Sequence, residues 1–114
     1  MTLIWGISRG AGVIPVLLTK MDDLESRDNN APPGYINALI RRLAGEYQVP
    51  LLDNRAVMDK LPNRGAIEDG FHYNKPADNQ TANFSPGYLQ YGYNQRNLTG
   101  LQALDVLRRA VMGL

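Results

Sequence analysis

The chain has 114 residues, a formal net charge of +1 at pH 7 and no cysteine. This near-neutral charge gives no indication of a nucleic-acid or anionic-membrane partner. The absence of cysteine excludes disulfides, thiolate nucleophiles and cysteine-ligated metals. The longest apolar run, residues 13–18, is too short to span a membrane, and no signal peptide is visible, so the compartment stays open.

The first half of the chain has the pattern of part of an α/β domain. We expect residues 2–9 to end a helix that stops at Gly10 and Gly12, although a short strand fits these residues as well. Residues 13–19 form a near-continuous apolar run, which predicts a parallel strand covered on both faces. The polar residues 20–33 predict a long loop at the carboxyl end of that strand, where loops often line sites in α/β folds.

The clearest helix is predicted over residues 35–47. Its apolar residues recur at i, i+3, i+4 and i+7, whereas polar residues such as Asn37 and Arg41 occupy the other side. Residues 49–53 then predict a second short buried strand. This order of strand, helix and strand predicts a parallel pair joined by a helical crossover.

The second half of the chain predicts more loop than regular structure. A short helix is expected over residues 55–60 and a turn over residues 61–65. Residues 75–94 predict a long surface loop, whose tyrosines either line a binding cleft or pin the loop to the domain. The final helix is expected to begin at Asn97 or Thr99, in a capping-box pattern, and to bury an apolar stripe. The tyrosines are Tyr88, Tyr91 and Tyr93, and the stripe comprises Leu101, Leu104, Leu107 and Val111.

The only histidine of the chain, His72, lies three residues after Asp69, with Gly70 between them to let the chain turn. Histidine is the side chain best suited to moving protons near neutral pH. A carboxylate beside one ring nitrogen would fix the tautomer and leave the other nitrogen free to act as a base. A surface turn with an incidental histidine has the same spacing, but the position before the C-terminal helix favours an acid–base pair.

A competing motif is Gly6-Ile7-Ser8-Arg9-Gly10, which matches the Gly-x-Ser-x-Gly nucleophile elbow of α/β-hydrolases. A true elbow opens a helix, whereas the apolar run that follows here suits a strand. Ser8 therefore fits a helix end better, but it stays the candidate nucleophile within the chain. The acidic residues show no metal-ligand spacing and the glycines form no phosphate-binding loop, so we expect neither a metal nor a cofactor. Lys20, after the first strand, either faces the ligand crevice or is solvated.

Four blocks of the sequence resemble the SGNH hydrolases, also called GDSL-type lipases and acylhydrolases. In the order of that family's late strands and final catalytic block, they are Gly12 to Thr19, Tyr35 to Ala44, Val49 to Asp53 and Asp69 to Asn74. The resemblance implies a flavodoxin-like three-layer α/β/α fold and the hydrolysis of esters or related acyl bonds. It also implies that His72 is the general base and Asp69 its orienter, with Tyr73 in place of the family's usual proline.

The resemblance covers residues 12–74 well, but no Gly-Asp-Ser nucleophile block occurs in the chain, and the family's oxyanion-hole donors are missing with it. We therefore expect residues 1–114 to be a single domain or the C-terminal portion of an SGNH hydrolase domain. Its substrate would be a small-molecule ester, with Lys20 and Tyr73 as candidate substrate-binding residues, and the chain alone would be nearly inactive. The alternative is a non-catalytic α/β binding or assembly module, which pairs with itself or with an N-terminal half.

Overall fold

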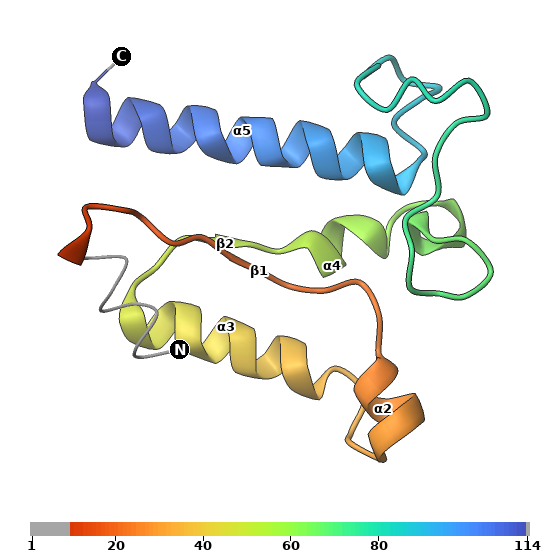
Figure 1. Ribbon diagram of the computed structural model, residues 1–114, viewed down its shortest axis with the longest axis horizontal. Coiled ribbons are helices and arrows are strands. Elements are labelled where there is room, and N and C mark those ends of the chain that lie inside the picture. Colours follow the sequence, from red (N-terminus) through yellow and green to blue (C-terminus); the bar gives the residue numbers. More distant parts are fainter. Residues whose placement is uncertain (1–9, 114) are drawn as a thin grey trace. The chain divides into compact units, whose positions relative to one another are not determined.

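The computed structural model describes residues 10–113 of the chain. This part is mixed α/β and mostly helical, with two short parallel strands and flanking helices (Figure 1). It divides into two compact units, which meet in the sequence between Asp53 and Asn54. Within the described part, no helix is both long and apolar enough to cross a membrane.

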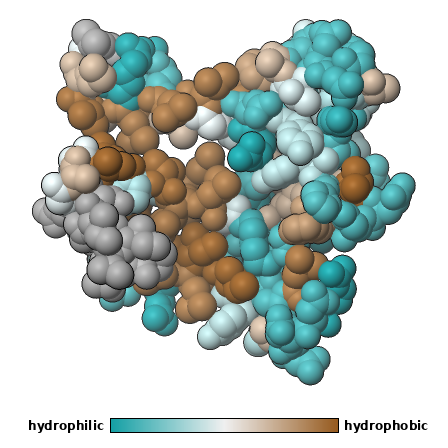
Figure 2. All heavy atoms as spheres, in the orientation of Figure 1, coloured by the Kyte–Doolittle hydropathy of each residue, from teal (hydrophilic) through white to brown (hydrophobic). Residues whose placement is uncertain are grey.

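The first unit contains the strand pair, β1 (Leu17–Leu18) and β2 (Leu51–Leu52), in the register Leu17 to Leu51 and Leu18 to Leu52. The predicted parallel pairing is confirmed, but both strands are much shorter than predicted. The expected burial of the first strand on both faces is wrong, because Leu17 is only half-buried and Leu18 is exposed. Its segment carries the exposed side chains Val13, Ile14, Val16 and Leu18. Figure 2 shows apolar residues gathered in the region of the strands.

A short helix, α2 (Leu24–Asn29), follows β1 where a loop is predicted. A carboxylate oxygen of Asp22 accepts the backbone N–H of Leu24 at 3.1 Å, so an acidic residue supports the first turn. The helix ends at Asn30, whose φ of 56° is left-handed. Six residues are too few to produce an apolar period, and this is why the loop prediction is wrong here.

Helix α3 (Tyr35–Tyr47) has the predicted bounds and packs against β1 and α2. It begins after Gly34, whose φ of 75° glycine adopts without strain, and ends at Gln48 in a left-handed conformation. Asn37, predicted on the polar side, is instead only 1% exposed. It is buried because its amide hydrogen-bonds the backbone that follows β1.

The second unit consists of α4 (Asn54–Met58), the 3-10 helix η1 (Pro62–Gly65) and α5 (Gly92–Met112), which contacts both. Met58 is fully buried here. The predicted short helix and turn are confirmed, but α5 begins at Gly92 rather than at Asn97 or Thr99. The acceptor for its first N–H is the Asn74 side chain, 18 residues upstream, so no local capping pattern marks this start.

The apolar stripe predicted for the last helix is not buried. Leu101, Leu104 and Val111 are between 56% and 64% exposed. The buried residues of α5 are Gly92 and Asn94, both in its first turn, because the neighbouring elements meet the helix at that end. The body of α5 therefore has no apolar covering among the described residues of the second unit.

Candidate functional site

Asp69 and His72 lie at the tip of a tight loop in the second unit. Ala66 and Tyr73 form an isolated antiparallel bridge at its base. Inside the loop, the backbone N–H of Ile67 donates to the carbonyl of His72 at 3.0 Å. Gly70, between the acid and the histidine, has a φ of 70°, which glycine adopts without cost from a Cβ. The chain therefore reverses between the two residues, as the glycine predicts.

The loop brings the Asp69 carboxylate against the His72 ring. Oδ2 of Asp69 lies 2.5 Å from Nδ1 of His72. Oδ1 accepts the backbone N–H groups of Phe71 and His72 at 2.8 and 3.0 Å. With the carboxylate ionised, Nδ1 carries the donated proton, and Nε2 of a neutral ring keeps its lone pair. Nε2 has no hydrogen-bond partner among residues 10–113, and the side chain is 62% exposed.

Three hydrogen bonds keep Asp69 ionised. The bond to the His72 ring is the largest cause, followed by the backbone N–H groups of His72 and Phe71, and together they lower the pKa of Asp69 to about 2. A carboxylate that stays charged at neutral pH can orient a neutral imidazole and stabilise the imidazolium that forms when Nε2 takes a proton. The arrangement is therefore chemically able to act as a general base.

Tyr73, a candidate substrate-binding residue, is half-buried inside the second unit. Its hydroxyl oxygen lies 2.6 Å from the side-chain nitrogen of Asn54, which is itself 1% exposed. The Tyr73 ring lies 5.5 Å from that of Tyr93, and the Arg96 guanidinium lies 5.8 Å from its centre. These contacts fix Tyr73 as an anchor for the loop that carries the acid–base pair.

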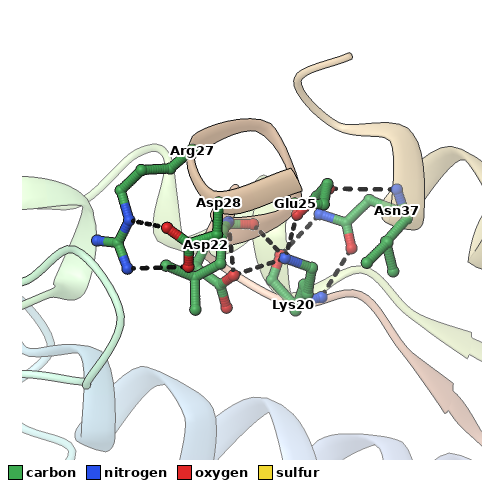
Figure 3. A network of polar contacts seen from close by, with 8 residues as sticks. Lys20, Asp22, Glu25, Arg27, Asp28 and Asn37 are labelled. Carbon is green, nitrogen blue, oxygen red and sulfur yellow. Dashed lines mark hydrogen bonds and ion pairs between the residues drawn. The ribbon is translucent and has the colours of Figure 1, made fainter. Parts of the chain in front are cut away.

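Lys20, the other candidate substrate-binding residue, lies in the first unit, in a cluster with Asp22, Glu25 and Asn37 (Figure 3). Its ammonium nitrogen is 2.5 Å from a carboxylate oxygen of Asp22 and from one of Glu25. Burial alone would lower the pKa of Lys20, but the hydrogen bonds to the two acids outweigh it and raise the pKa. The ammonium therefore stays charged and is held by two carboxylates.

The same cluster connects β1 to both helices of the first unit. Glu25 on α2 accepts the backbone N–H of Ile36 at 3.2 Å, in the first turn of α3, which has no side-chain cap of its own. The Asn37 side chain accepts the backbone N–H of Lys20 at 2.8 Å and donates to its carbonyl at 2.7 Å. Each buried polar group of this cluster has a partner inside the unit. The cluster therefore stabilises the packing of α2 and α3 against the segment that follows β1.

The predicted long loop before α5 is confirmed over residues 75–91. Side-chain amides pin it to the helix: Asn94 donates to the carbonyls of Gln80 and Asn83, and Asn97 to that of Thr81. A hollow of about 330 Å³ is lined by Pro76, Ala77, Asp78, Gly87, Tyr88 and Tyr91. Tyr88 and Tyr91 line this hollow, as expected if the tyrosines line a binding cleft. Tyr93, on α5, packs on Tyr73, as expected if they pin the loop to the domain.

The remaining candidate, Ser8, lies outside the described residues, as does the expected helix end over residues 2–9. Between residues 10 and 113, no group of three or more His, Asp or Glu side chains could hold a metal ion. The structure therefore brings together Asp69 and His72 and leaves the nucleophile unassigned.

Sequence reasoning missed the asparagines that hold these loops, of which Asn37 and Asn54 are buried and Asn74 is half-buried. Asn37 precedes Ile40 by three residues and Ala44 by seven, and this spacing was the available signal that it lies on the buried face. No periodic signal marks Asn54 or Asn74, because each bonds a distant segment. Comparisons with protein-family models, with curated proteins and with solved structures found no match to this chain.

Proposed function

We propose that this chain supplies the acid–base half of a Ser-His-Asp ester hydrolase of the SGNH type. The observation that supports it is the Asp69–His72 pair, in which an ionised carboxylate holds Nδ1 and leaves Nε2 exposed. The parallel strand pair with its crossover helix is compatible with the proposed flavodoxin-like α/β/α fold.

In the proposed reaction, Nε2 of His72 takes the proton of a serine hydroxyl as the serine attacks the acyl carbonyl. The imidazolium then protonates the leaving alcohol. In the second half, His72 takes a proton from water as the water attacks the acyl-serine carbonyl, and it returns this proton to the serine oxygen as the acyl–serine bond breaks and the acid leaves. Asp69 holds the ring and stabilises its charged form throughout. The reaction needs no cofactor.

The chain contains no Gly-Asp-Ser sequence, so we propose that the nucleophile comes from a segment outside it, with Ser8 as the candidate within it. We expect purified chain to show no turnover of p-nitrophenyl acetate above the uncatalysed rate. Robust turnover that Ser8→Ala abolishes would instead identify Ser8 as the nucleophile. Turnover lost in His72→Ala but kept in Ser8→Ala would contradict the expected inactivity of the isolated chain.

The hydrolase function is tested on the protein encoded by the complete reading frame, including any sequence upstream of Met1. We expect the coding sequence upstream of Met1 to encode an in-frame Gly-Asp-Ser block, and a fluorophosphonate to label that serine. His72→Ala should greatly reduce labelling, because the serine then lacks its base. If neither this product nor the chain is labelled or shows turnover, the hydrolase proposal is overturned.

A second candidate function is a non-catalytic module that binds or assembles. The exposed apolar side chains around β1 favour it, because such a surface is normally covered in a soluble protein. We expect self-association, or pairing with an N-terminal half on another chain. Multi-angle light scattering at high protein concentration tests this, and a clean monomer that does not bind that half would contradict it.

A further inference from the structure

Asn74, at the base of the loop that carries the acid–base pair, uses all four of its polar groups. Its backbone N–H donates to Gly65 at 2.9 Å and its carbonyl accepts the N–H of Tyr93 at 3.1 Å. Its side-chain oxygen accepts the N–H of Gly92 at 2.7 Å, and its side-chain nitrogen lies 3.5 Å from the carbonyl of Ala66. One residue thus joins η1, the loop base and α5.

The junction replaces the missing cap of α5. The residue at the N-cap position, Tyr91, makes no capping side-chain bond. Asn74 accepts the first two N–H groups of the helix instead, which would otherwise lack acceptors. The approach is so close that a Cβ on Gly92 would collide with the carbonyl oxygen of Gly65. Gly92 is thus the residue that lets this contact form.

The acid–base pair is held locally by the hydrogen bonds of Asp69 to His72 and Phe71, but it has no buried side chain of its own. Asp69 and His72 have exposed side chains, so no core packing holds them in place. Their loop returns to the body of the unit through Tyr73 and Asn74. Tyr73 is anchored through its hydroxyl, whereas Asn74 fixes the backbone itself to a 21-residue helix. The base of the loop therefore takes its position from α5.

We propose that Asn74 is a positioning residue for the acid–base pair. Its side-chain oxygen, held by the N–H of Gly92, fixes the loop base and thereby the Asp69 carboxylate against Nδ1 of His72. A positioning role in catalysis rests on the hydrolase function proposed above, whereas the dependence of the pair's geometry on Asn74 does not.

The test uses nuclear magnetic resonance on the chain itself, in which His72 is the only histidine and gives one set of ring signals. In Asn74→Ala we expect the ¹⁵N shifts of the ring to move from the Nδ1–H tautomer toward a mixture of both. The pKa of Asp69 should rise from about 2 toward 3.8 as its hydrogen bonds loosen. Asn74→Asp keeps an acceptor for the N–H of Gly92 and should preserve both signals.

Asn97→Ala is the matched control, because Asn97 also donates its amide to a loop carbonyl, that of Thr81, but has no bond to the loop of the pair. It should leave the His72 and Asp69 signals unchanged. If Asn74→Ala does not fold, Asn74→Gln replaces it, since the longer side chain keeps the amide but moves its oxygen.

A folded Asn74→Ala or Asn74→Gln chain with parental His72 and Asp69 signals would overturn the positioning role. So would a disturbance in Asn74→Asp as large as in Asn74→Ala. These readouts need no turnover, so the positioning role can fail or stand independently of the labelling experiment that tests the hydrolase function.

Discussion

The Lys20 cluster of the first unit and the Asp69–His72 pair of the second contain the same kind of contact, a carboxylate oxygen 2.5 Å from a side-chain nitrogen. Their surroundings differ. Glu25 is 5% exposed and its second oxygen accepts a backbone N–H, so its contact is enclosed. In the pair, the acid and the histidine are 39% and 62% exposed, and Nε2 is without a partner in the described part of the chain.

This difference separates a contact that holds the fold from one that is available for chemistry. A buried ion pair whose groups are all satisfied has nothing left to offer a substrate, and removing one partner leaves the other uncompensated. An exposed pair contributes little to stability, but its free nitrogen can exchange protons. Variants of the Lys20 cluster should therefore destabilise the first unit. Changing Asp69 should alter the titration of the pair and have little effect on stability.

The largest effect is expected for Glu25→Ala. Lys20 then keeps only one carboxylate and the N–H of Ile36 loses its acceptor, so we expect the first unit to lose about 3 kcal/mol. Urea unfolding followed through amide signals of α3 measures the change. Asp28→Ala, which removes an exposed pair with Arg27, is the control and should unfold like the parent. An equal loss in both variants would contradict the enclosed character of the cluster.

Asn37→Ala should have the next largest effect. It removes both side-chain bonds to the Lys20 backbone and leaves those two groups unsatisfied, at a cost of about 2 kcal/mol. Hydrogen exchange at the amide of Lys20 should accelerate accordingly. Arg42→Ala, on the exposed side of the same helix, should leave that exchange rate unchanged. Protection of Lys20 that survives Asn37→Ala would show that the asparagine is dispensable.

The sequence predicted elements whose signal is local and periodic. The 13-residue helix α3 was found at its bounds because two full turns of apolar spacing mark it. The Asp69–His72 geometry could be anticipated because the acid, the glycine and the histidine lie within four residues. The strand pairing followed from the order of elements, whereas strand length did not, because length depends on neighbouring strands.

The features that sequence reasoning missed depend on contacts between distant residues. The start of α5 is set by Asn74, and the burial of Asn37 by the backbone of Lys20, 17 residues away. Asparagine is mostly exposed in proteins, so a buried role becomes visible only when its partners are known. Helix α2 was missed because six residues, stabilised by Asp22, give no apolar period.

A smaller loss of stability is expected for Tyr73→Phe in the second unit. The change deprives the buried amide of Asn54 of its hydrogen-bond partner, and we expect a cost of about 1–2 kcal/mol. Urea unfolding followed through amide signals of α4 is the measurement. Tyr91→Phe is the control, because the Tyr91 hydroxyl has no side-chain bond in the described residues. Identical stability of Tyr73→Phe and the parent would mean that Tyr73 does not anchor the loop.

The smallest effect on stability is expected from titrating Asp69, and it distinguishes the two regions by pH. The pKa of Asp69 is lowered from its ordinary value of 3.8 to about 2. The bond between Asp69 and His72 therefore stabilises the folded chain fully above pH 3.8, and this stabilisation is lost as the pH falls through about 2. Burial would raise the pKa of Glu25, but the bond from Lys20 lowers it overall, so the cluster too is lost in acid.

Protonating the enclosed carboxylate of Glu25 should unfold the first unit. Protonating the exposed carboxylate of Asp69 should only release the His72 ring from its hydrogen bond. We therefore expect acid to remove the amide signals of α3 cooperatively, while the Asp69 carboxyl ¹³C signal titrates near pH 2 with α5 still formed. Asp69→Asn should abolish that titration without moving the acid unfolding of α3. An Asp69 midpoint near 3.8, or loss of α5 in step with it, would contradict this assignment of the exposed pair.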